Sequence, residues 1–285
     1  MVRRVGFIGL GDIGEPMARN LCGGQFEVVV HDLRPEAVKT LVEQGAKGAS
    51  SSREVGERCE VIGVCVVDDA ATESVVAGED GLLAGAAADT VVAVHSTVHP
   101  ETVRRLARRA AERGVALIDA QMTGGRYGAE QRKLRYMVGG DEAVVERCRP
   151  VFETSAAEIT HCGEIGMGAI AKLCNNLVQY QAWQGYVEAT QLAKHTGLER
   201  EKLLEVLAWI MNDNARTFLA GRSALEEDPD NEFLRGRLTP PMLLAEKDLG
   251  LALDVARGAG VSMPGTALCQ QQAARIFAIP DPKRR

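Results

Sequence analysis

The chain has 285 residues, of which 46% are hydrophobic and 25% are charged. That composition excludes a disordered or fibrous protein, and the length suits two domains of about 150 residues each. The formal net charge of −6 argues against a nucleic-acid partner, because binding to a phosphate backbone depends on clustered cations. The densest arginine run, between residues 104 and 113, has helical spacing and is interpreted as a solvated helix face.

Short β-branched runs alternate with amphipathic stretches over the first 160 residues. Most of these runs are continuously apolar, which is typical of strands covered by helices on both faces. The expected strands are residues 5–8, 28–31, 61–67, 91–94 and 115–118, and the expected helices include 35–44 and 100–113. The alternation predicts a doubly wound parallel sheet. Strands at 134–138 and 158–161, on either side of a helix that starts near Asp141, extend it.

The pattern changes after Cys162. Residues 166–195 form one long helical pattern without proline, and the rest is helical, punctuated at Pro229, Pro240-Pro241 and Pro264. A loop is expected over 226–237 and a frayed tail over 280–285. We therefore expect an α/β domain, residues 1–163, and an all-helical domain, residues 164–285, joined by the long interdomain helix.

Cysteine, histidine and N-terminal patterns bear on compartment and metal binding. The seven cysteines contain no Cys-x-x-Cys pair, so neither a disulfide framework nor a zinc site is expected. The five histidines lack metal-ligand spacing, so no metal is expected. The N-terminus has no signal-peptide pattern, and no apolar run approaches the roughly 18 residues of a membrane span. We expect a cytoplasmic protein with no membrane partner.

A glycine-rich loop follows the first expected strand and opens a helix; its residues are Gly9, Leu10, Gly11, Asp12, Ile13 and Gly14. In this context, Gly-x-Gly-x-x-Gly indicates a Rossmann dinucleotide site. The first glycine permits the tight turn, the second admits a pyrophosphate, and the third packs helix against strand. Asp32, at the end of the second strand, would bind the adenine ribose and repel a 2′-phosphate, which favours NAD. Arg34 keeps NADP open as an alternative, because it could pair with that phosphate.

Five segments, residues 6–21, 96–100, 119–125, 163–176 and 247–250, carry a resemblance that spans nearly the whole chain. In these segments the chain resembles the β-hydroxyacid dehydrogenases, which include 3-hydroxyisobutyrate dehydrogenase, tartronate semialdehyde reductase and, more distantly, the phosphogluconate dehydrogenases. The resemblance implies an NAD(P)-dependent enzyme that acts on the CH–OH group of a small, 3-hydroxyisobutyrate-like acid and yields its semialdehyde or keto acid. It also implies a homodimer or homotetramer built through the helical domain.

Lys172 and Asn176 are four residues apart and share a helix face with Gly168. A lysine beside a nicotinamide can take the hydroxyl proton as hydride leaves, and Lys172 is therefore the expected general acid/base. Asn176 resembles the family's substrate-orienting amide. Gly166 and Gly168 are expected to leave room for a ligand at the start of this helix.

The other expected site residues come from the resemblance. Thr123, Gly124 and Gly125 resemble the family's substrate-carboxylate loop, in which exposed N–H groups and a hydroxyl cradle the acid. Contacts with the dinucleotide are implied for Val66, Val67, Thr97 and Lys247. Arg126, directly after the two glycines, departs from the small or neutral residue of many relatives. Either it binds a second anionic group of the substrate, such as a diacid, or it is a surface residue.

Two rival functions remain open at this point. An imine reductase-like NADPH enzyme would share the architecture, but such relatives generally lack a lysine at the position of Lys172. A non-catalytic dinucleotide-binding sensor would keep the glycine loop without the lysine. The lysine and the Thr-Gly-Gly loop together favour the dehydrogenase.

Overall fold

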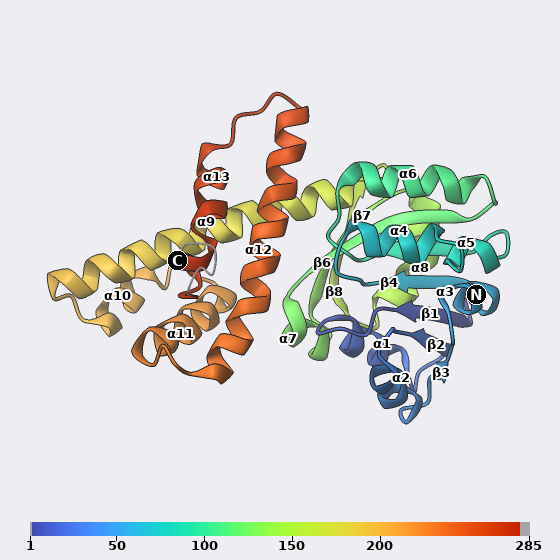
Figure 1. Cartoon of the computed structure of the whole chain (residues 1–285), viewed down its shortest axis with the longest axis horizontal. Helices are drawn as coiled ribbons and strands as arrows, with labels where there is room; N and C mark the ends of the chain where they lie inside the picture. The colour runs from blue at the N-terminus through green and yellow to red at the C-terminus, as the bar shows by residue number, and fades with distance from the viewer. Residues whose placement is uncertain (1, 280–285) are drawn as a thin grey trace. The chain divides into compact units, whose positions relative to one another are not determined.

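Within residues 2–279, which this computed structural model describes, the first part of the chain forms one eight-stranded sheet in the order β3-β2-β1-β4-β5-β6-β7-β8 (Figure 1). The strands are β1 (Arg4–Ile8), β2 (Glu27–His31), β3 (Lys47–Gly48), β4 (Val61–Val64), β5 (Val91–Val94), β6 (Ala116–Thr123), β7 (Leu134–Gly139) and β8 (Ala156–Gly163). All neighbours pair in parallel except β6 and β7, which are antiparallel. The doubly wound α/β fold is confirmed, with one reversed strand pair.

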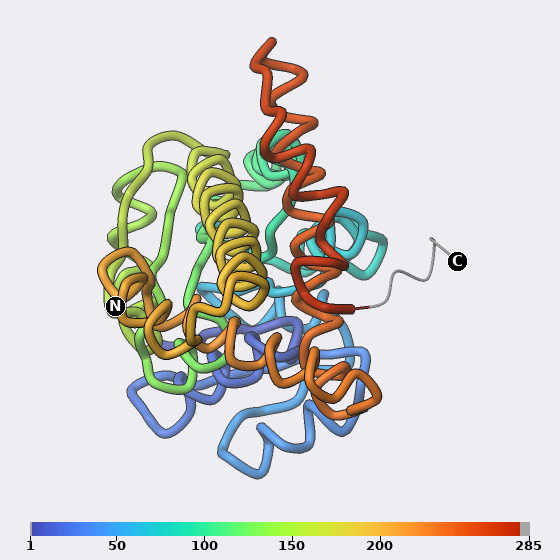
Figure 2. Tube along the Cα trace, turned by 90° about the vertical axis from the view of Figure 1, so that its left-hand side faces the viewer, coloured from blue at the N-terminus to red at the C-terminus, as the bar shows by residue number. Residues whose placement is uncertain are grey.

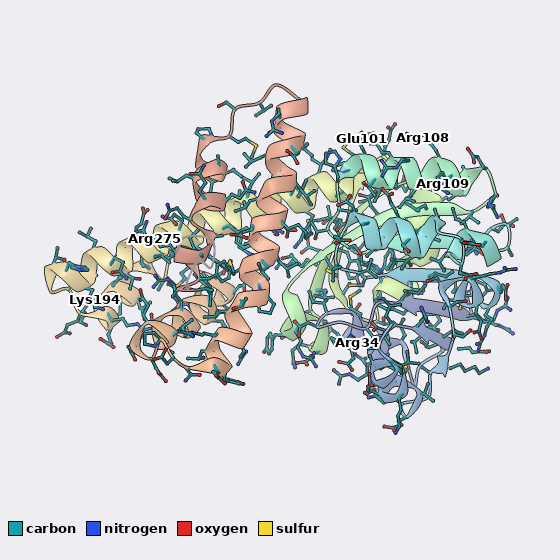
Figure 3. All side chains as sticks on the ribbon, viewed as in Figure 1. Arg34, Glu101, Arg108, Arg109, Lys194 and Arg275 are labelled. Atoms are coloured by element: carbon teal, nitrogen blue, oxygen red, sulfur yellow. The ribbon has the colours of Figure 1, made fainter. Side chains whose placement is uncertain are left out.

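Helices cover both faces of this sheet, and the continuous apolar strands are the reason. Neighbouring residues of one strand enter opposite cores: Val28 and Val30 belong to one apolar cluster and Val29 to the other. The covering helices are α1 (Gly14–Leu21), α2 (Pro35–Val42), α3 (Ser52–Arg58), α4 (Asp69–Ala77), α5 (Leu82–Gly85), α6 (Pro100–Ala111), α7 (Gly125–Glu130) and α8 (Glu142–Phe152). Arg108 and Arg109 are exposed on α6, as the solvated-face interpretation expects (Figure 3).

The rest of the chain is helical: α9 (Met167–Thr196), α10 (Arg200–Leu207), α11 (Asp213–Glu227), α12 (Glu232–Gly258), α13 (Pro264–Gln271) and α14 (Ala273–Ile276). The α9 helix is the long continuous coil drawn in yellow in Figure 2. An aromatic core holds the later helices together, with the rings of Trp183 and Phe218 stacked 4.0 Å apart between centroids. The edge of Phe277 packs against both rings.

The chain divides into two compact units, Met1–Lys172 and Leu173–Arg285, called here the sheet unit and the helical unit. The first thus includes the beginning of α9. The tail expected at 280–285 lies outside the described residues.

Three local expectations were wrong. Residues 226–237 are not one loop, because α11 continues to Glu227 and α12 begins at Glu232, where the Asn231 side chain accepts a hydrogen bond from Leu234 N at 3.1 Å. Pro240 and Pro241 do not separate two helices either. The α12 helix runs through both prolines, and buried residues further along the helix hold it in place. The strand expected to extend to residue 67 ends at 64, and the short β3 was not expected.

Candidate functional site

A cavity of about 750 Å³ opens in the sheet unit where β1, β2 and β4 end. The strand order reverses at this point: the chain proceeds from β1 outward to β2 and β3, and then returns to β4 on the other side of β1. Open α/β sheets bind their ligands at such a position, outside the carboxyl ends of the strands. Six residues that the sequence singled out for cofactor binding line the cavity: Gly9, Gly11, Asp32, Arg34, Val66 and Val67.

The three glycines of the loop have different local constraints. Gly9 has a φ of +90°, and a Cβ there would collide with the carbonyl oxygen of Cys65. A Cβ on Gly14 would collide with the carbonyl oxygen of Gly9. A Cβ on Gly11 would meet no heavy atom within 4 Å. The loop therefore leaves open space at its middle glycine, where a pyrophosphate would approach the backbone, and the residues fit a dinucleotide.

The other loop residues point in different directions. Leu10 is buried in the core, Ile13 packs against that core, and Asp12 is exposed. Val66 N donates a hydrogen bond of 2.8 Å to Ser96 Oγ, which ties together the segments that follow β4 and β5. Thr97 follows β5 and is half-buried, but it is not among the residues that line the cavity.

Asp32 is held in place by the loop that it faces. One carboxylate oxygen accepts a hydrogen bond from Leu10 N at 2.7 Å. The other accepts from the backbone N and the Nε of Arg34, at 2.8 and 3.1 Å. Burial raises the pKa of Asp32, but the hydrogen bonds from Arg34 and Leu10 outweigh it and leave the pKa below its ordinary value. Asp32 is therefore a carboxylate at neutral pH, able to accept further hydrogen bonds at the cavity wall.

Arg34, labelled in Figure 3, is anchored in this structure. Besides its contact with Asp32, its Nη2 donates to the carbonyl oxygen of Leu10 at 2.8 Å. The side chain is 60% exposed. A 2′-phosphate would have to compete with Asp32 for this guanidinium.

Sequence reasoning missed part of the cavity wall. His31, Ser50, Ser51 and Ser74 also line it, as do residues 78–80. His31 ends β2, and Ser50 and Ser51 come shortly after β3, separated from it by Ala49. The order of the strands, which brings their carboxyl ends to one edge, could have pointed to His31, Ser50 and Ser51, but not to Ser74 and residues 78–80, which belong to α4 and the segment after it.

The Thr123-Gly124-Gly125 loop lies where β6 ends and α7 begins. Gly124 and Gly125 have φ values of +123° and +61°, in the region that favours glycine. A Cβ on Gly125 would meet nothing within 4 Å, so this turn is open to a ligand. Arg126 follows directly, and its guanidinium contacts three carboxylates, those of Asp12, Glu15 and Glu130.

The start of α9 is held by a buried carboxylate that the sequence did not single out. Asp119, in the middle of β6, is fully buried and accepts hydrogen bonds from Gly166 N at 2.7 Å and Ala169 N at 2.6 Å. Burial raises the pKa of Asp119, an effect that these two hydrogen bonds oppose. Lys172 is half-buried and lies one turn beyond Ala169 on the same helix.

This packing corrects the expectation that Gly166 and Gly168 leave room for a ligand. A Cβ on Gly168 would lie 2.5 Å from Met137 O and 2.8 Å from Asp119 Oδ2. A Cβ on Gly166 would lie 2.9 Å from Arg104 Nε. Gly168 is therefore needed for the close approach of α9 to the sheet, whereas Gly166, with a φ of +91°, adopts a backbone conformation that favours glycine beside the Arg104 side chain of α6.

In the helical unit, one aspartate joins two of the expected site residues. Asp248 Oδ2 accepts a hydrogen bond from Asn176 Nδ2 at 2.6 Å, and Asp248 Oδ1 lies 2.9 Å from Lys247 Nζ. Asp248 and Asn176 are both buried. The sequence assigns no role to Asp248, and the only signal that could have found it is its place beside Lys247 in the segment 247–250.

Residues 2–279 contain neither a membrane-spanning helix nor a metal-binding cluster. None of the helices there is long and apolar enough to span a bilayer. No group of three or more His, Cys, Asp or Glu side chains in that range could hold a metal ion.

Comparison with known proteins places both parts of the chain. Residues 4–163 match the family model described as the NAD binding domain of 6-phosphogluconate dehydrogenase. Residues 166–279 match the model described as NAD-binding of NADP-dependent 3-hydroxyisobutyrate dehydrogenase.

Individual relatives match over nearly their whole length. The chain is 37% identical to 3-hydroxyisobutyrate dehydrogenase of Pseudomonas aeruginosa, covering 93% of this chain and 89% of that protein. It is 33% identical to 2-(hydroxymethyl)glutarate dehydrogenase of Eubacterium barkeri, covering 94% and 87%. The solved structure of Mycobacterium tuberculosis 3-hydroxyisobutyrate dehydrogenase with L-serine is 28% identical, covers 98% and 94%, and has a TM-score of 0.83. The chain therefore belongs to the β-hydroxyacid dehydrogenase family and is an NAD(P)-dependent oxidoreductase that acts on CH–OH groups.

Proposed function

We propose that this protein transfers a hydride between NAD and a small β-hydroxyacid of the 3-hydroxyisobutyrate type, and so interconverts the acid with its semialdehyde or keto acid. The observation that carries the proposal is the first turn of α9. Asp119 holds that turn to the sheet by two hydrogen bonds, and Lys172 follows one turn later. A general acid/base must be held in a defined position to share a proton with a substrate hydroxyl, and a capped, buried helix start supplies that rigidity.

The residues proposed to contact the substrate supply a base, hydrogen-bond donors for a carboxylate, and an amide. Lys172 Nζ takes the proton of the substrate hydroxyl during oxidation and returns it during reduction. The Thr123 hydroxyl and the backbone N–H groups of Gly124 and Gly125 bind the substrate carboxylate. The Asn176 amide orients the substrate, with Asp248 keeping that amide in place.

The dinucleotide is proposed to bind in the cavity of the sheet unit. When bound, the nicotinamide supplies the hydride acceptor or donor. The open face of Gly11 admits the pyrophosphate, and Asp32 accepts hydrogen bonds from the adenine ribose hydroxyls. Val66, Val67, Thr97 and Lys247 complete the dinucleotide contacts. NAD is favoured over NADP because Arg34 is already engaged by Asp32 and by the Leu10 carbonyl.

Other expectations from the sequence remain predictions. They are the domain limits 1–163 and 164–285, the cytoplasmic location and the homodimer or homotetramer. Three exposed apolar side chains at and just after the end of α10 support self-association: Trp209 is 94% exposed, and Val206 and Ile210 are each 70% exposed.

The proposal is tested by turnover with a panel of β-hydroxyacids, followed by the absorbance of the reduced cofactor. We expect Lys172→Met to lower kcat by about 10²–10⁴-fold, because it removes the amine and keeps the stem. NAD affinity, measured by direct titration, should be unchanged. Lys194→Met is the matched control: Lys194 is exposed near the far end of the same helix (Figure 3) and should retain full activity.

The rival functions give different results. Saturable NAD binding with no turnover on any acid would indicate the dinucleotide sensor. Turnover of cyclic imines with NADPH, unaffected by Lys172→Met, would indicate the imine reductase. Full activity of Lys172→Met on a hydroxyacid would refute the assigned role of this lysine.

A further inference from the structure

Arg126 lies at the centre of a cluster of four charged side chains. Its Nε is 2.8 Å from Glu130 Oε1, its Nη2 is 3.3 Å from Glu15 Oε2, and its Nη1 is 3.4 Å from Asp12 Oδ1. The same Nη1 also donates to the backbone carbonyl oxygen of Asp12 at 3.3 Å. Every nitrogen of the guanidinium is thus engaged within the sheet unit.

These partners belong to two segments that are far apart in sequence. Asp12 is in the glycine loop and Glu15 is in the first turn of α1, whereas Glu130 ends α7. The α7 helix lies beside α1 (Figure 1). A second contact joins them, since Asn20 Nδ2 donates to the carbonyl oxygen of Ala129 at 2.8 Å. Arg126 therefore connects the loop that would hold the pyrophosphate to the helix that follows Thr123-Gly124-Gly125.

The charges explain why a cation is useful there. Asp12 and Glu15 place two carboxylates at the start of α1, next to the open face of Gly11. A pyrophosphate carries negative charge and would be repelled by both. The guanidinium offsets this repulsion while it holds the two segments together, and a planar five-donor group can contact several carboxylates at once.

We propose that Arg126 is a positioning residue that clamps the substrate-carboxylate loop to the glycine loop, so that binding of the dinucleotide and binding of the acid strengthen each other. This rests on the proposed function, which assigns the two loops to the two ligands. It differs from the sequence-based hypothesis that Arg126 binds a second anionic group of the substrate. In that role the guanidinium would have to leave three carboxylates.

The test uses the full-length chain with Arg126→Ala and Arg126→Lys, after their thermal unfolding midpoints have been compared with that of the wild type. Dissociation constants for NADH are measured by fluorescence titration, with and without 3-hydroxyisobutyrate. KM is measured for this monoacid and for the diacid 2-(hydroxymethyl)glutarate. Arg149→Ala is the matched control, because it removes an arginine of similar exposure that pairs with Glu146 on α8.

We expect Arg126→Ala to weaken NADH binding about three- to tenfold, the sum of a few part-exposed ion pairs. The strengthening of NADH binding by the acid should fall towards none, and the acid's affinity should lose the same factor, because coupling is reciprocal. Arg126→Lys keeps the charge but not the planar guanidinium, so its NADH affinity and coupling should lie between those of the wild type and Arg126→Ala. The KM values of monoacid and diacid should rise by the same factor, and Arg149→Ala should behave as wild type.

Two results would overturn the clamp. The first is unchanged NADH affinity and unchanged coupling in Arg126→Ala. The second is a rise in KM for the diacid alone, which would show that the guanidinium is a substrate ligand.

Hydrogen exchange separates failure of the clamp from failure of the proposed function, because it needs no turnover. With NADH alone, residues 125–130 should become protected in the wild type and not in Arg126→Ala. If no acid is oxidised and this difference is still seen, the proposed function fails and the link between the loops stands. If the difference is missing, the clamp is wrong whatever the turnover.

Discussion

The carboxylate of Asp119 offers the sharpest test of how α9 is held. The perturbation is Asp119→Ala, which leaves Gly166 N–H and Ala169 N–H buried without an acceptor. A hydrogen bond to a charged group contributes about 1.5–3 kcal/mol, so removing two costs about 3–6 kcal/mol before compensation. Part of this cost is offset, because Asp119→Ala also removes the penalty for burying a carboxylate, the same burial that raises the pKa of Asp119. We expect a net loss of about 3 kcal/mol.

Asp119→Asn refines this estimate. The amide keeps one acceptor oxygen and turns its NH₂ towards the other backbone N–H, so we expect a loss of about 2 kcal/mol. The exposed Asp141 is the matched control. It caps α8 through hydrogen bonds from Ala143 N and Val144 N, at 2.9 and 3.2 Å, and Asp141→Ala should cost only about 1 kcal/mol.

Hydrogen exchange measured by mass spectrometry is the suitable assay, because it reports on the start of α9 directly. Both tryptophans, Trp183 and Trp209, lie in the helical unit, so their fluorescence does not follow the sheet unit. A local loss of 2–3 kcal/mol corresponds to about 30- to 150-fold faster exchange over residues 166–172. Exchange in Asp119→Ala no faster than in Asp141→Ala would refute the claim that the buried carboxylate holds this helix.

The remaining predictions concern the cofactor loop, a buried histidine and the helical unit. Gly11→Ala should leave the thermal unfolding midpoint unchanged and abolish NAD binding in a titration, whereas Gly14→Ala should lower that midpoint. Equal effects of the two substitutions would contradict the different constraints on these glycines. Burial lowers the pKa of His95 to about 4. The unfolded chain therefore takes up a proton on this imidazole below its ordinary pKa of about 6.5, while the folded protein does not, and the free energy of unfolding decreases as the pH falls from 6.5 towards 4. Wild type should therefore lose about 2 kcal/mol more than His95→Gln in urea unfolding between pH 7.5 and pH 5, and parallel pH profiles would disprove this. Asp248→Ala should raise KM for the acid, because it releases the Asn176 amide, and should leave the affinity for NADH unchanged. An unchanged KM would show that Asp248 does not position Asn176 for the substrate.

The elements that sequence predicted well were those with a strong local signal. The apolar runs that became β1, β2 and β5 are covered on both sides, so their composition alone marked them as buried strands. Proline at the first turn marked the starts of α2 and α6 correctly. The glycine spacing located the loop because each role depends on backbone geometry that few residues allow.

The errors came where distant contacts outweighed local preference. The polar segment 226–237 is mostly helical because its ends are joined to helices that pack in a core. Gly168, expected to leave room for a ligand, instead lets α9 approach Asp119 and Met137. The direction of β7 was missed because periodicity along a strand is the same whether its neighbour runs parallel or antiparallel.

The sequence by itself determined the family, the dinucleotide loop and the division into an α/β part and a helical part, because these depend on short-range spacing and on the polarity of each segment. Tertiary structure alone decided which distant residues meet: Asp119 with the start of α9, Asp248 with Asn176, and Arg126 with Asp12. Such pairings depend on strand order and helix packing, and no local pattern encodes them. A charge or amide therefore acquires its role only when the fold brings its partner within hydrogen-bonding distance.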